Sequence, residues 1–571
     1  MRMLAGADGT RETAPVEALP TAVPDERVVT TDVTAVDDDG TGRGPRSDRW
    51  LRVLCHLAAE LPLVVFGAVE SARGWRPLYD NADLAYRSFQ VFSSHSPLVG
   101  HQMAVSAGSH AVFGPGPLQS WILAVPVRVD PAQGALWGGV AAAVVAVALA
   151  IEAIWSVGGW RGGAATAGCV LVFALVRPEV ALDVVWNVWF ALLFLVTTFC
   201  TALAVVTGRL RWWPVTVLAA SVVVQCQAAF APPAVLLCLL APLPALVAGR
   251  RRLARDRFGW LVAGLGAGVV VWAAPVLQEV ANRPGNLTLL VRAAQSGPTI
   301  GTSAALRTLG GATRMLPAWV RPLPTGGGLA QFFGVVAMTS GPEWWGLAVL
   351  SILVAVTAVS WWTGRRTLAA LSFLTLLAAI GGVVTVASIP RAQFLVLGYL
   401  GAVLALIGIA VWVTFAWAAA EVVVASLRRL RGDGVVETAS PWVDRARWPA
   451  AALLLGLSAW LIATGMAQMD GTAPTLSGWA AVRATDAASA AAARVAPTGA
   501  FGLQVEGASS TDPLAVETGV AYQLATRGFD PRPTTAIGYP TFGRPPVGGP
   551  TVVVVLSGPG RTVHAHIRSG S

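Results

Sequence analysis

Residues 135–156 read ALWGGVAAAVVAVALAIEAIWS, a run of 22 residues whose single charge is Glu152. About 20 apolar residues in a helix span the hydrocarbon core of a bilayer, so this run predicts a transmembrane helix. The whole chain of 571 residues has the same character, because 55% of its residues are hydrophobic and only 12% are charged. Soluble domains carry about 25% charged residues. We therefore expect an all-α polytopic membrane protein.

Ten other hydrophobic runs resemble this one, which brings the prediction to about eleven helices. Arginine clusters occupy several short connections, and an even number of predicted helices separates each cluster from the next. Because Lys and Arg are enriched in cytoplasmic loops, these connections predict one cytoplasmic face that also holds the amino terminus. The predicted spans are 54–72, 135–156, 164–180, 184–207, 214–230, 234–248, 258–276, 344–363, 367–388, 393–424 and 448–468.

The polar parts of the chain predict the domain organisation. Residues 1–50 are rich in Asp, Thr, Pro and Gly and lack an apolar run, a composition typical of a disordered tail, here cytoplasmic. Residues 51–469 form the predicted membrane domain, with external segments at 73–133 and 277–343. Residues 470–571 form a predicted external domain.

Two of the external parts have recognisable patterns. In the first loop, the amphipathic stretch Leu84–Phe92 and a second one after a Gly-Pro-Gly-Pro turn predict helices lying in the membrane interface. In the tail, a small-residue linker at 487–493 precedes strand-like residues 501–505, helix-like residues 513–527 and a strand-like valine run at 551–556. Alternating strand and helix patterns indicate a small α/β module.

Asp80 and Asp83 are the candidate catalytic residues of the first external loop. Three residues apart, they share one face of a helical turn. A carboxylate at a membrane interface can accept a proton from a hydroxyl nucleophile within hydrogen-bonding distance. The alternative is a solvated acidic turn that caps the following amphipathic helix, and spacing alone does not exclude it.

Three of the six histidines lie close together in the same loop: His95, His101 and His110. They could orient a phosphate, or bind a divalent cation such as Mg, Mn or Ca together with Asp80 and Asp83. Their spacing matches no specific metal motif, so ordinary loop histidines are an equal alternative.

Two arginines lie in short external turns, where the cytoplasmic enrichment of arginine disfavours them. Arg391 lies between two predicted spans, and Arg177 precedes Pro178 and Glu179. Guanidinium groups suit bidentate phosphate recognition, which predicts a substrate-binding role. Alternatively, both arginines are anchors at the headgroup level, and Arg177 pairs with Glu179.

Several function classes lose support from the sequence. It contains no Walker A loop, dinucleotide fingerprint or HExxH motif, and its net charge of +9 belongs to membrane loops rather than to a nucleic-acid site. The five cysteines lie in or beside hydrophobic runs without metal-ligand spacing. Charges within the spans are few (Glu60, Glu70, Glu152 and Glu421), which disfavours an ion-coupled transporter.

These motifs together resemble actinobacterial integral-membrane proteins of the GT-C glycosyltransferase class. The resemblance lies in an acidic motif at Asp80, the segment His95-Ser96-Pro97-Leu98-Val99-Gly100 and the turn Gly114-Pro115-Gly116-Pro117 before an amphipathic helix. A second signature comprises Trp272-Ala273-Ala274-Pro275-Val276-Leu277-Gln278 and Pro284-Gly285-Asn286-Leu287. The similarity covers roughly residues 55–425, and the tail looks similar to a small external domain of some members.

The resemblance implies sugar transfer from a polyprenyl-phosphate donor to an envelope glycan or lipid acceptor outside the cytoplasmic membrane. Asp80 maps onto the class's catalytic base and His95 onto its loop histidine, while Asp83 would assist or help to hold a cation. The chain departs from the pattern at Gly114, where the class usually has histidine, and at Tyr79, where it has glycine. The competing interpretation is a non-catalytic transporter, flippase or envelope-assembly partner.

Overall fold

The computed structural model describes residues 46–571 except 109, 245–254, 296, 315–340, 392–397, 432–445, 472–473, 496–498, 508–512, 535–541, 543–544, 548, 558–561 and 569–571. The predicted disordered tail therefore lies outside the described residues, apart from its last five positions. These positions are helical, because the first helix begins at Arg46.

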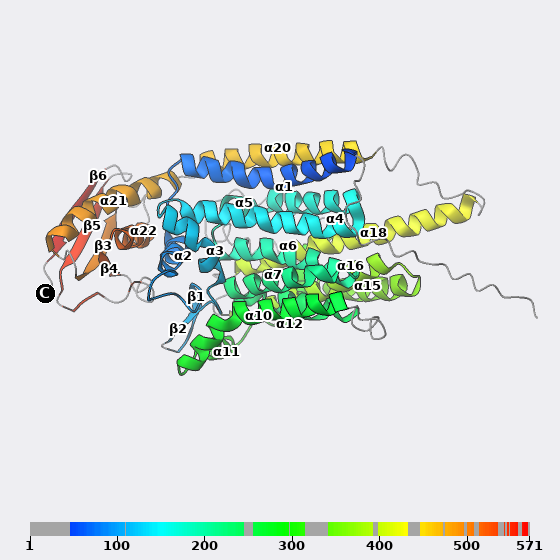
Figure 1. Ribbon diagram of the computed structural model, residues 1–571, viewed down its shortest axis with the longest axis horizontal. Helices are drawn as coiled ribbons and strands as arrows, with labels where there is room; N and C mark the ends of the chain where they lie inside the picture. The colour runs from blue at the N-terminus through cyan, green and yellow to red at the C-terminus, as the bar shows by residue number, and fades with distance from the viewer. Residues whose placement is uncertain are drawn as a thin grey trace, which may run out of the picture. The chain divides into compact units, whose positions relative to one another are not determined.

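Eight helices of the described part are long and apolar enough to cross a membrane, and shorter apolar helices pack among them. The chain is a multi-pass membrane protein with a mostly helical fold (Figure 1). The predicted spans at 214–230 and 234–248 correspond to shorter helices, α7 and α8. The long helices are α1 (Arg46–Ala72), α4 (Gly134–Val176), α6 (Asn187–Val206), α10 (Arg255–Ala281), α15 (Glu343–Trp362), α16 (Arg366–Ala387), α18 (Ala402–Arg431) and α20 (Arg447–Gly471); the shorter ones are α3 (Leu118–Val129), α7 (Trp213–Cys226) and α8 (Ala231–Leu240).

Helix α4 reverses direction at Gly159. Its 43 residues would extend about 65 Å as one straight helix, about twice the thickness of the hydrocarbon core. Gly159 has φ +59° and ψ −146°, a conformation that glycine adopts without steric penalty. Beyond it, a Cβ on Gly162 would lie 2.8 Å from the carbonyl oxygen of Ile154, although residues eight apart in a straight helix are about 12 Å apart. The reversal agrees with the two spans predicted at 135–156 and 164–180.

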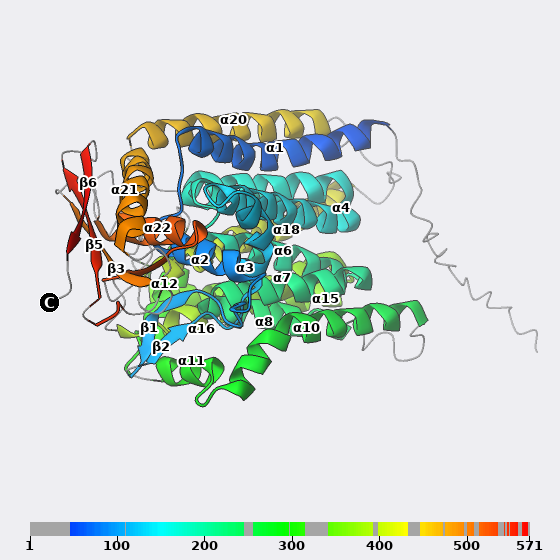
Figure 2. The same ribbon diagram turned by 60° about the vertical axis from the view of Figure 1, so that its left-hand side comes forward.

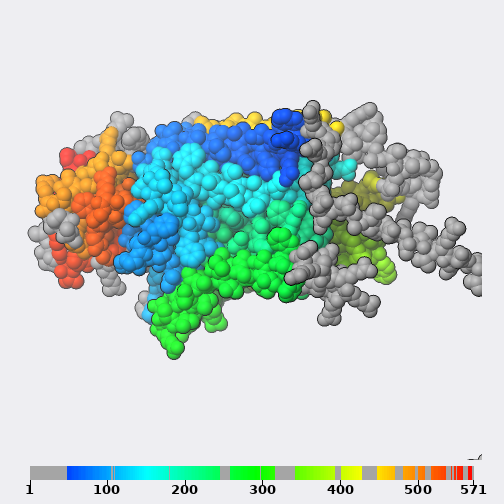
Figure 3. All heavy atoms as spheres, in the orientation of Figure 1, coloured from blue at the N-terminus to red at the C-terminus, as the bar shows by residue number. Residues whose placement is uncertain are grey.

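The helices differ in how much protein covers them. Helix α6 is buried almost throughout and α16 is largely buried, whereas α10, α15 and α20 expose most of their apolar windows. On α10, Val269 and Val280 are each 73% exposed, and this helix runs along the lower edge of the surface in Figure 3. Apolar side chains in such positions suit contact with lipid.

Glu60 and Glu152, which lie within two of the predicted spans, are both hydrogen-bonded to His56. The two ring nitrogens of His56 lie 2.7 Å from Glu60 Oε1 and 2.8 Å from Glu152 Oε1, and Glu152 also pairs with Arg52. Charges in a low-dielectric bundle require partners of this kind. These groups therefore connect α1 to α4.

The opposite end of α1 leads into small elements that lie together at one end of the bundle (Figures 1 and 2). The amphipathic stretch predicted at 84–92 belongs to α2, and the second one forms α3, which packs against α2. An antiparallel hairpin that the sequence analysis did not predict lies between them. These elements are α2 (Tyr79–Gln90), β1 (Gln102–Ala107), β2 (His110–Phe113), α5 (Glu179–Leu182) and α11 (Asn286–Ala294). Helix α12 (Gly301–Ala312) packs against α15 and α16. The described part also has 3-10 turns at Leu210–Trp212, Ala228–Phe230 and Gly398–Gly401.

The carboxyl-terminal part forms a four-stranded sheet in the order β4-β3-β5-β6. Strand β3 is parallel to both β4 and β5, and β5 is antiparallel to β6. The predicted strands at 501–505 and 551–556 and the helix at 513–527 are present, whereas β4 and β6 were not predicted. The elements are β3 (Ala500–Gly507), α22 (Pro513–Thr526), β4 (Asp530–Pro533), β5 (Thr551–Ser557) and β6 (Thr562–Arg568).

The prediction of a linker at 487–493 was wrong. These residues belong to α21 (Pro474–Val495), which packs against α22 and the sheet. Ala480, Ala484, Ala488 and Ala491 are fully buried and recur at the spacing of one helix face. Alanine has the highest helix propensity, so a run that was interpreted as a spacer forms a close-packed helix.

Gly116 of the Gly-Pro-Gly-Pro turn lies against the buried carboxamide of Gln225 on α7. A Cβ on Gly116 would lie 2.1 Å from Gln225 Oε1 and 2.7 Å from the ring of Pro275. Gln225 Nε2 donates to the Val271 carbonyl at 2.8 Å, and Oε1 accepts from the Leu118 N–H at 3.3 Å. The carboxamide cannot move away without losing both hydrogen bonds.

We expect Gly116→Ala to lower the free energy of unfolding by about 1–3 kcal/mol, as overpacking does in other cores. Gly456→Ala is the matched control, because nothing lies within 4 Å of a Cβ at that position on α20. Denaturant unfolding of both variants in detergent measures the difference. Equal stability of the two variants would contradict the tight packing at Gly116.

Candidate functional site

Asp80 lies in the first turn of α2, where its side chain is exposed. The helix is anchored by its opposite face, on which Ala82 and Ala85 are fully buried. Asp80 Oδ2 accepts a hydrogen bond from Trp186 Nε1 at 3.1 Å. Its other oxygen, Oδ1, accepts no hydrogen bond from the described residues. The carboxylate is thus oriented through one oxygen and open at the other.

Asp183 is a further acidic residue of this site, and the sequence analysis did not single it out. It lies in the turn between α5 and α6, and its Oδ1 accepts a hydrogen bond from Asn81 Nδ2 at 3.2 Å. Burial raises the pKa of Asp183 to about 6, and the nearby charge of Asp80 acts in the same direction. Two acids from separate loops therefore share one site. The sequence did contain one indication of Asp183, since it is an acidic residue in a short turn predicted to be external.

Asp83 and His101 complete this group. Arg87 Nε donates to Asp83 Oδ1 at 3.1 Å, and the Gln102 N–H donates to Asp83 Oδ2 at 3.4 Å. His101 is buried beside both aspartates. Burial lowers its pKa more strongly than Asp80 and Asp83 raise it, so the ring is neutral at pH 7. The structure therefore brings together three of the predicted residues, Asp80, Asp83 and His101, and their catalytic and binding roles stay predictions.

The other predicted residues lie in separate environments. His95 is exposed, with Nδ1 3.2 Å from Ser94 Oγ in its own loop. Arg391 is also exposed; its N–H donates to the Pro298 carbonyl at 2.9 Å, and its guanidinium forms no hydrogen bond or ion pair with the described residues. Arg177 is buried at the end of α4, but the side chain of its proposed partner Glu179 lies outside the described part. Their substrate-binding roles stay predictions.

The second sequence signature contacts the first. Asn286 Oδ1 accepts from the Phe113 N–H at 3.0 Å, and Asn286 Nδ2 donates to the Phe113 carbonyl at 3.0 Å. Gln278 Oε1 in turn accepts from the Asn286 N–H at 2.9 Å. Asn286 is buried, and its carboxamide hydrogen-bonds both backbone groups of Phe113 at the end of β2. The second signature therefore holds the first external loop in place through the hydrogen bonds of Asn286, the first residue of α11.

A divalent cation at Asp80, Asp83 and His95 was one prediction from the sequence. Among the described residues, no group of three His, Cys, Asp or Glu side chains is placed to hold a metal ion. His95 has hydrogen bonds only within its own loop. The residues of this site do not fit a metal centre as they stand, so no chemical step is assigned to a cation.

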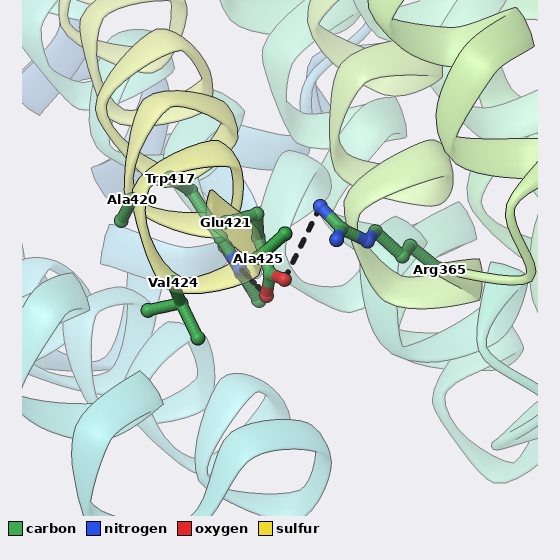
Figure 4. Close-up of a pocket in the computed structure, with 6 residues that line it drawn as sticks. All are labelled: Arg365, Trp417, Ala420, Glu421, Val424 and Ala425. Atoms are coloured by element: carbon green, nitrogen blue, oxygen red, sulfur yellow. Dashed lines mark hydrogen bonds and ion pairs between the residues drawn. The ribbon is translucent and has the colours of Figure 1, made fainter. Parts of the chain in front are cut away.

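Two cavities in the described part are lined by residues other than Asp80. One holds about 370 Å³ and is lined by Trp417 and Glu421 of α18 and by Arg365 before α16. Figure 4 shows Arg365 facing Glu421 across it, with Arg365 Nη1 3.3 Å from Glu421 Oε2. Arg365 belongs to a connection that the sequence predicts to be cytoplasmic. The second cavity lies between the first loop and α21 and α22.

Searches with family models and against characterised proteins find no match. Among solved structures, the crystal structure of ArnT from Cupriavidus metallidurans in the apo state aligns with a TM-score of 0.41 and 15% sequence identity, covering 86% of this chain and 92% of that chain. A likeness of that extent decides neither the fold family nor the activity.

Tyr79, which directly precedes Asp80, has φ +50° and is the one non-glycine residue with positive φ in the described part. Its N–H donates to Thr518 Oγ1 of α22 at 2.9 Å. The left-handed conformation costs about 1–2 kcal/mol for a residue with a Cβ. The backbone at position 79 therefore has a conformation that glycine adopts more readily than tyrosine.

We expect Tyr79→Gly to be more stable than Tyr79→Ala by about 1 kcal/mol, because both lose the ring and only alanine keeps the strained Cβ. Thermal unfolding of the two variants in the same detergent compares them directly. A higher unfolding temperature for Tyr79→Ala would show that position 79 is not left-handed.

Proposed function

We propose that this chain is a membrane glycosyltransferase of the GT-C type. It moves a sugar from a polyprenyl-phosphate donor to an envelope glycan or lipid acceptor on the external face, with inversion at the anomeric carbon. The amino terminus is cytoplasmic and the carboxyl-terminal domain external. Membrane lipids surround the protein, and nucleic acid is not a partner.

The carboxylate group formed by Asp80, Asp83 and Asp183 carries the proposal. It lies at the end of an apolar bundle, on helix α2 and the turn before α6, where a lipid-borne substrate would present its polar head. Asp80 is exposed and oriented by Trp186, which suits a group that must meet an incoming hydroxyl. Asp83, by contrast, is paired with Arg87, as Glu152 in the bundle is paired with Arg52.

The proposed step is a direct displacement. Asp80 Oδ1 takes the proton of the acceptor hydroxyl while the acceptor oxygen attacks the anomeric carbon of the donor sugar. The bond from that carbon to the phosphate oxygen breaks, and polyprenyl phosphate leaves with the electron pair. The product glycoside has the inverted configuration. Positioned charges that favour such a transition state are often the largest catalytic contribution.

The remaining predicted residues have supporting roles in this proposal. His101, neutral and buried beside the aspartates, holds the loop that follows α2. Arg391, Arg177 or His95 would approach the donor phosphate once substrate is bound. The isoprenoid tail contributes affinity of about 0.8 kcal/mol per buried CH₂, so the sugar site does not have to supply most of the binding energy.

The competing class, a transporter or flippase, requires charged relays through the bilayer. In the described part, Glu60 and Glu152 are joined to each other through His56 rather than arranged along a pathway, and Glu421 is paired with Arg365. This pairing favours a structural role for Glu60, Glu152 and Glu421. The acidic group outside the spans remains the better candidate for function.

Asp80→Asn should abolish transfer, with a loss of at least about 10²–10⁴-fold in kcat, because the amide cannot accept the proton. The amide oxygen still accepts the Trp186 hydrogen bond, so the unfolding temperature should stay near that of the wild type. Purified protein incubated with radiolabelled polyprenyl-phosphate sugars and envelope acceptors measures the transfer.

Glu506→Gln is the matched control. Glu506 is an exposed acid of β3 that pairs with Arg568 on the carboxyl-terminal sheet, away from α2. We expect this variant to keep full activity. A fully active Asp80→Asn enzyme would end the assignment of Asp80 as the base.

The ionisation of Asp183 should appear in the pH dependence of transfer. With a pKa of about 6, Asp183 is neutral below that pH and negative above it. Its negative charge stabilises the positive charge that develops on the donor sugar, so kcat should rise as the pH increases through about 6. In Asp183→Asn this rise should disappear while measurable activity remains. If kcat of Asp183→Asn still rose through about pH 6 as in the wild type, the role of Asp183 would be contradicted.

A further inference from the structure

A second cavity, of about 140 Å³, lies between the first external loop and the two helices of the tail. One wall is formed by Arg76 and Ala132, which flank the interfacial elements of the loop. The other wall belongs to α21 and α22. Its complete lining is Arg76, Ala132, Ala481, Val482, Thr485, Gly519, Gln523 and Arg527.

The lining is cationic, because it contains two arginines and no carboxylate. Arg76 Nη1 donates to the Trp75 carbonyl at 2.8 Å, and Arg527 Nη1 donates to Asp486 Oδ1 and to Ser489 Oγ, both at 3.0 Å. Each guanidinium has five N–H donors, so both keep further donors for a ligand. Asp486 offsets the charge of Arg527, so the lining keeps a net positive charge from Arg76 that a bound anion would balance.

The size of the cavity suits a small oxyanion. On this measure a cavity needs about 10–15 Å³ to hold one water molecule, so a volume of about 140 Å³ leaves room for a phosphate group. Thr485 and Gln523 supply polar groups beside the arginines. Arginine pairs with phosphate through short charge-assisted hydrogen bonds.

The cavity lies beside the ends of two helices that are long and apolar enough to cross a membrane. Arg76 follows the end of α1 at Ala72 by four residues, and Ala132 precedes the start of α4 at Gly134 by two. Both rim residues therefore lie beside the ends of helices that are apolar enough to cross the bilayer. Lipid phosphates occupy this level of a membrane.

Contacts around the cavity join it to the candidate site. Gln523 Nε2 and Tyr522 Oη donate to the Pro131 carbonyl at 3.3 and 2.7 Å. Thr518, next to the lining residue Gly519, accepts from the N–H of Tyr79. An occupant of the cavity would therefore connect the tail to the loop that carries Asp80.

We propose that this cavity is a phosphate-binding site, formed by Arg76 and Arg527, that joins the tail to the first loop. Its occupant is a phosphate group, carried either by a lipid headgroup or by a water-soluble molecule. The site is separate from the carboxylates of the transfer step. Its occupancy can thus be measured whether or not the chain transfers a sugar.

The test uses the full chain, purified in an uncharged glycoside detergent without phosphate. Its unfolding temperature is measured against inorganic phosphate, short-chain phosphatidylglycerol and uncharged diacylglycerol at matched ionic strength. A ligand that binds the folded state raises this temperature with saturation. We expect saturable stabilisation by a phosphate-bearing probe and none by diacylglycerol. Stabilisation by the lipid alone assigns a headgroup, and equal stabilisation by inorganic phosphate assigns a water-soluble source; both support the site.

Three variants separate the site from general charge effects. Arg76→Gln and Arg527→Gln should each weaken phosphate binding by about tenfold or more, as expected for the loss of a charge-assisted contact. Asp486→Asn breaks the same ion pair as Arg527→Gln but keeps the guanidinium, so it should bind phosphate at least as well as the wild type. Arg568→Gln, an exposed arginine outside the lining, should leave binding unchanged.

The proposal is overturned if no probe stabilises the protein with saturation. It is also overturned if Arg76→Gln and Arg527→Gln respond to the probes as Arg568→Gln does. Repeating the titration with Asp80→Asn keeps the two proposals apart, since this variant should lose transfer and still bind phosphate.

Discussion

The candidate site depends on two hydrogen bonds between neighbouring residues of α2 and of the turn before α6. Trp186 donates to Asp80, and Asn81 donates to Asp183. Carboxylates cannot enter the apolar bundle without a large desolvation penalty, so they collect where it ends. These two contacts hold them there in a defined arrangement, and they place a group with a pKa near 6 beside an exposed base. The chemistry of the site follows from that arrangement rather than from either acid alone.

The sequence predicted the fold far better than it predicted the site. Each apolar run carries its own signal, because about 20 residues cross a bilayer wherever they occur, and even the two spans on either side of Gly159 were separable. Asp183 gave only a weak signal, its place in a short turn predicted to be external, because its hydrogen bond with Asn81 joins residues 102 positions apart and exists only after folding. The linker prediction at 487–493 failed for another reason: small residues are typical of spacers and of close-packed helices alike. Which of the two forms depends on the burial of residues such as Ala488.

Two positions at which the sequence differs from the pattern it resembles have distinct backbone environments. Tyr79 has φ +50°, a conformation that glycine adopts more readily than a residue with a Cβ. At Gly114 even a Cβ would lie 2.9 Å from the Gln225 carbonyl oxygen. A larger side chain at position 114 therefore requires movement of α7 or of the turn.

Helix α2 contacts both the helix bundle and the carboxyl-terminal tail, so both parts of the chain position the candidate site. The bundle holds it through Trp186 and Asp183, while the tail contacts it through Thr518 and through the ring of Phe542, whose centroid lies 4.6 Å from that of Tyr86. The strained conformation of Tyr79 persists only where surrounding contacts define it. The Thr518 hydrogen bond is one such contact, and it comes from 439 residues along the chain. The position of Asp80 is therefore a property of the folded loop and tail together, and a change on α22 can reach the site without touching a carboxylate.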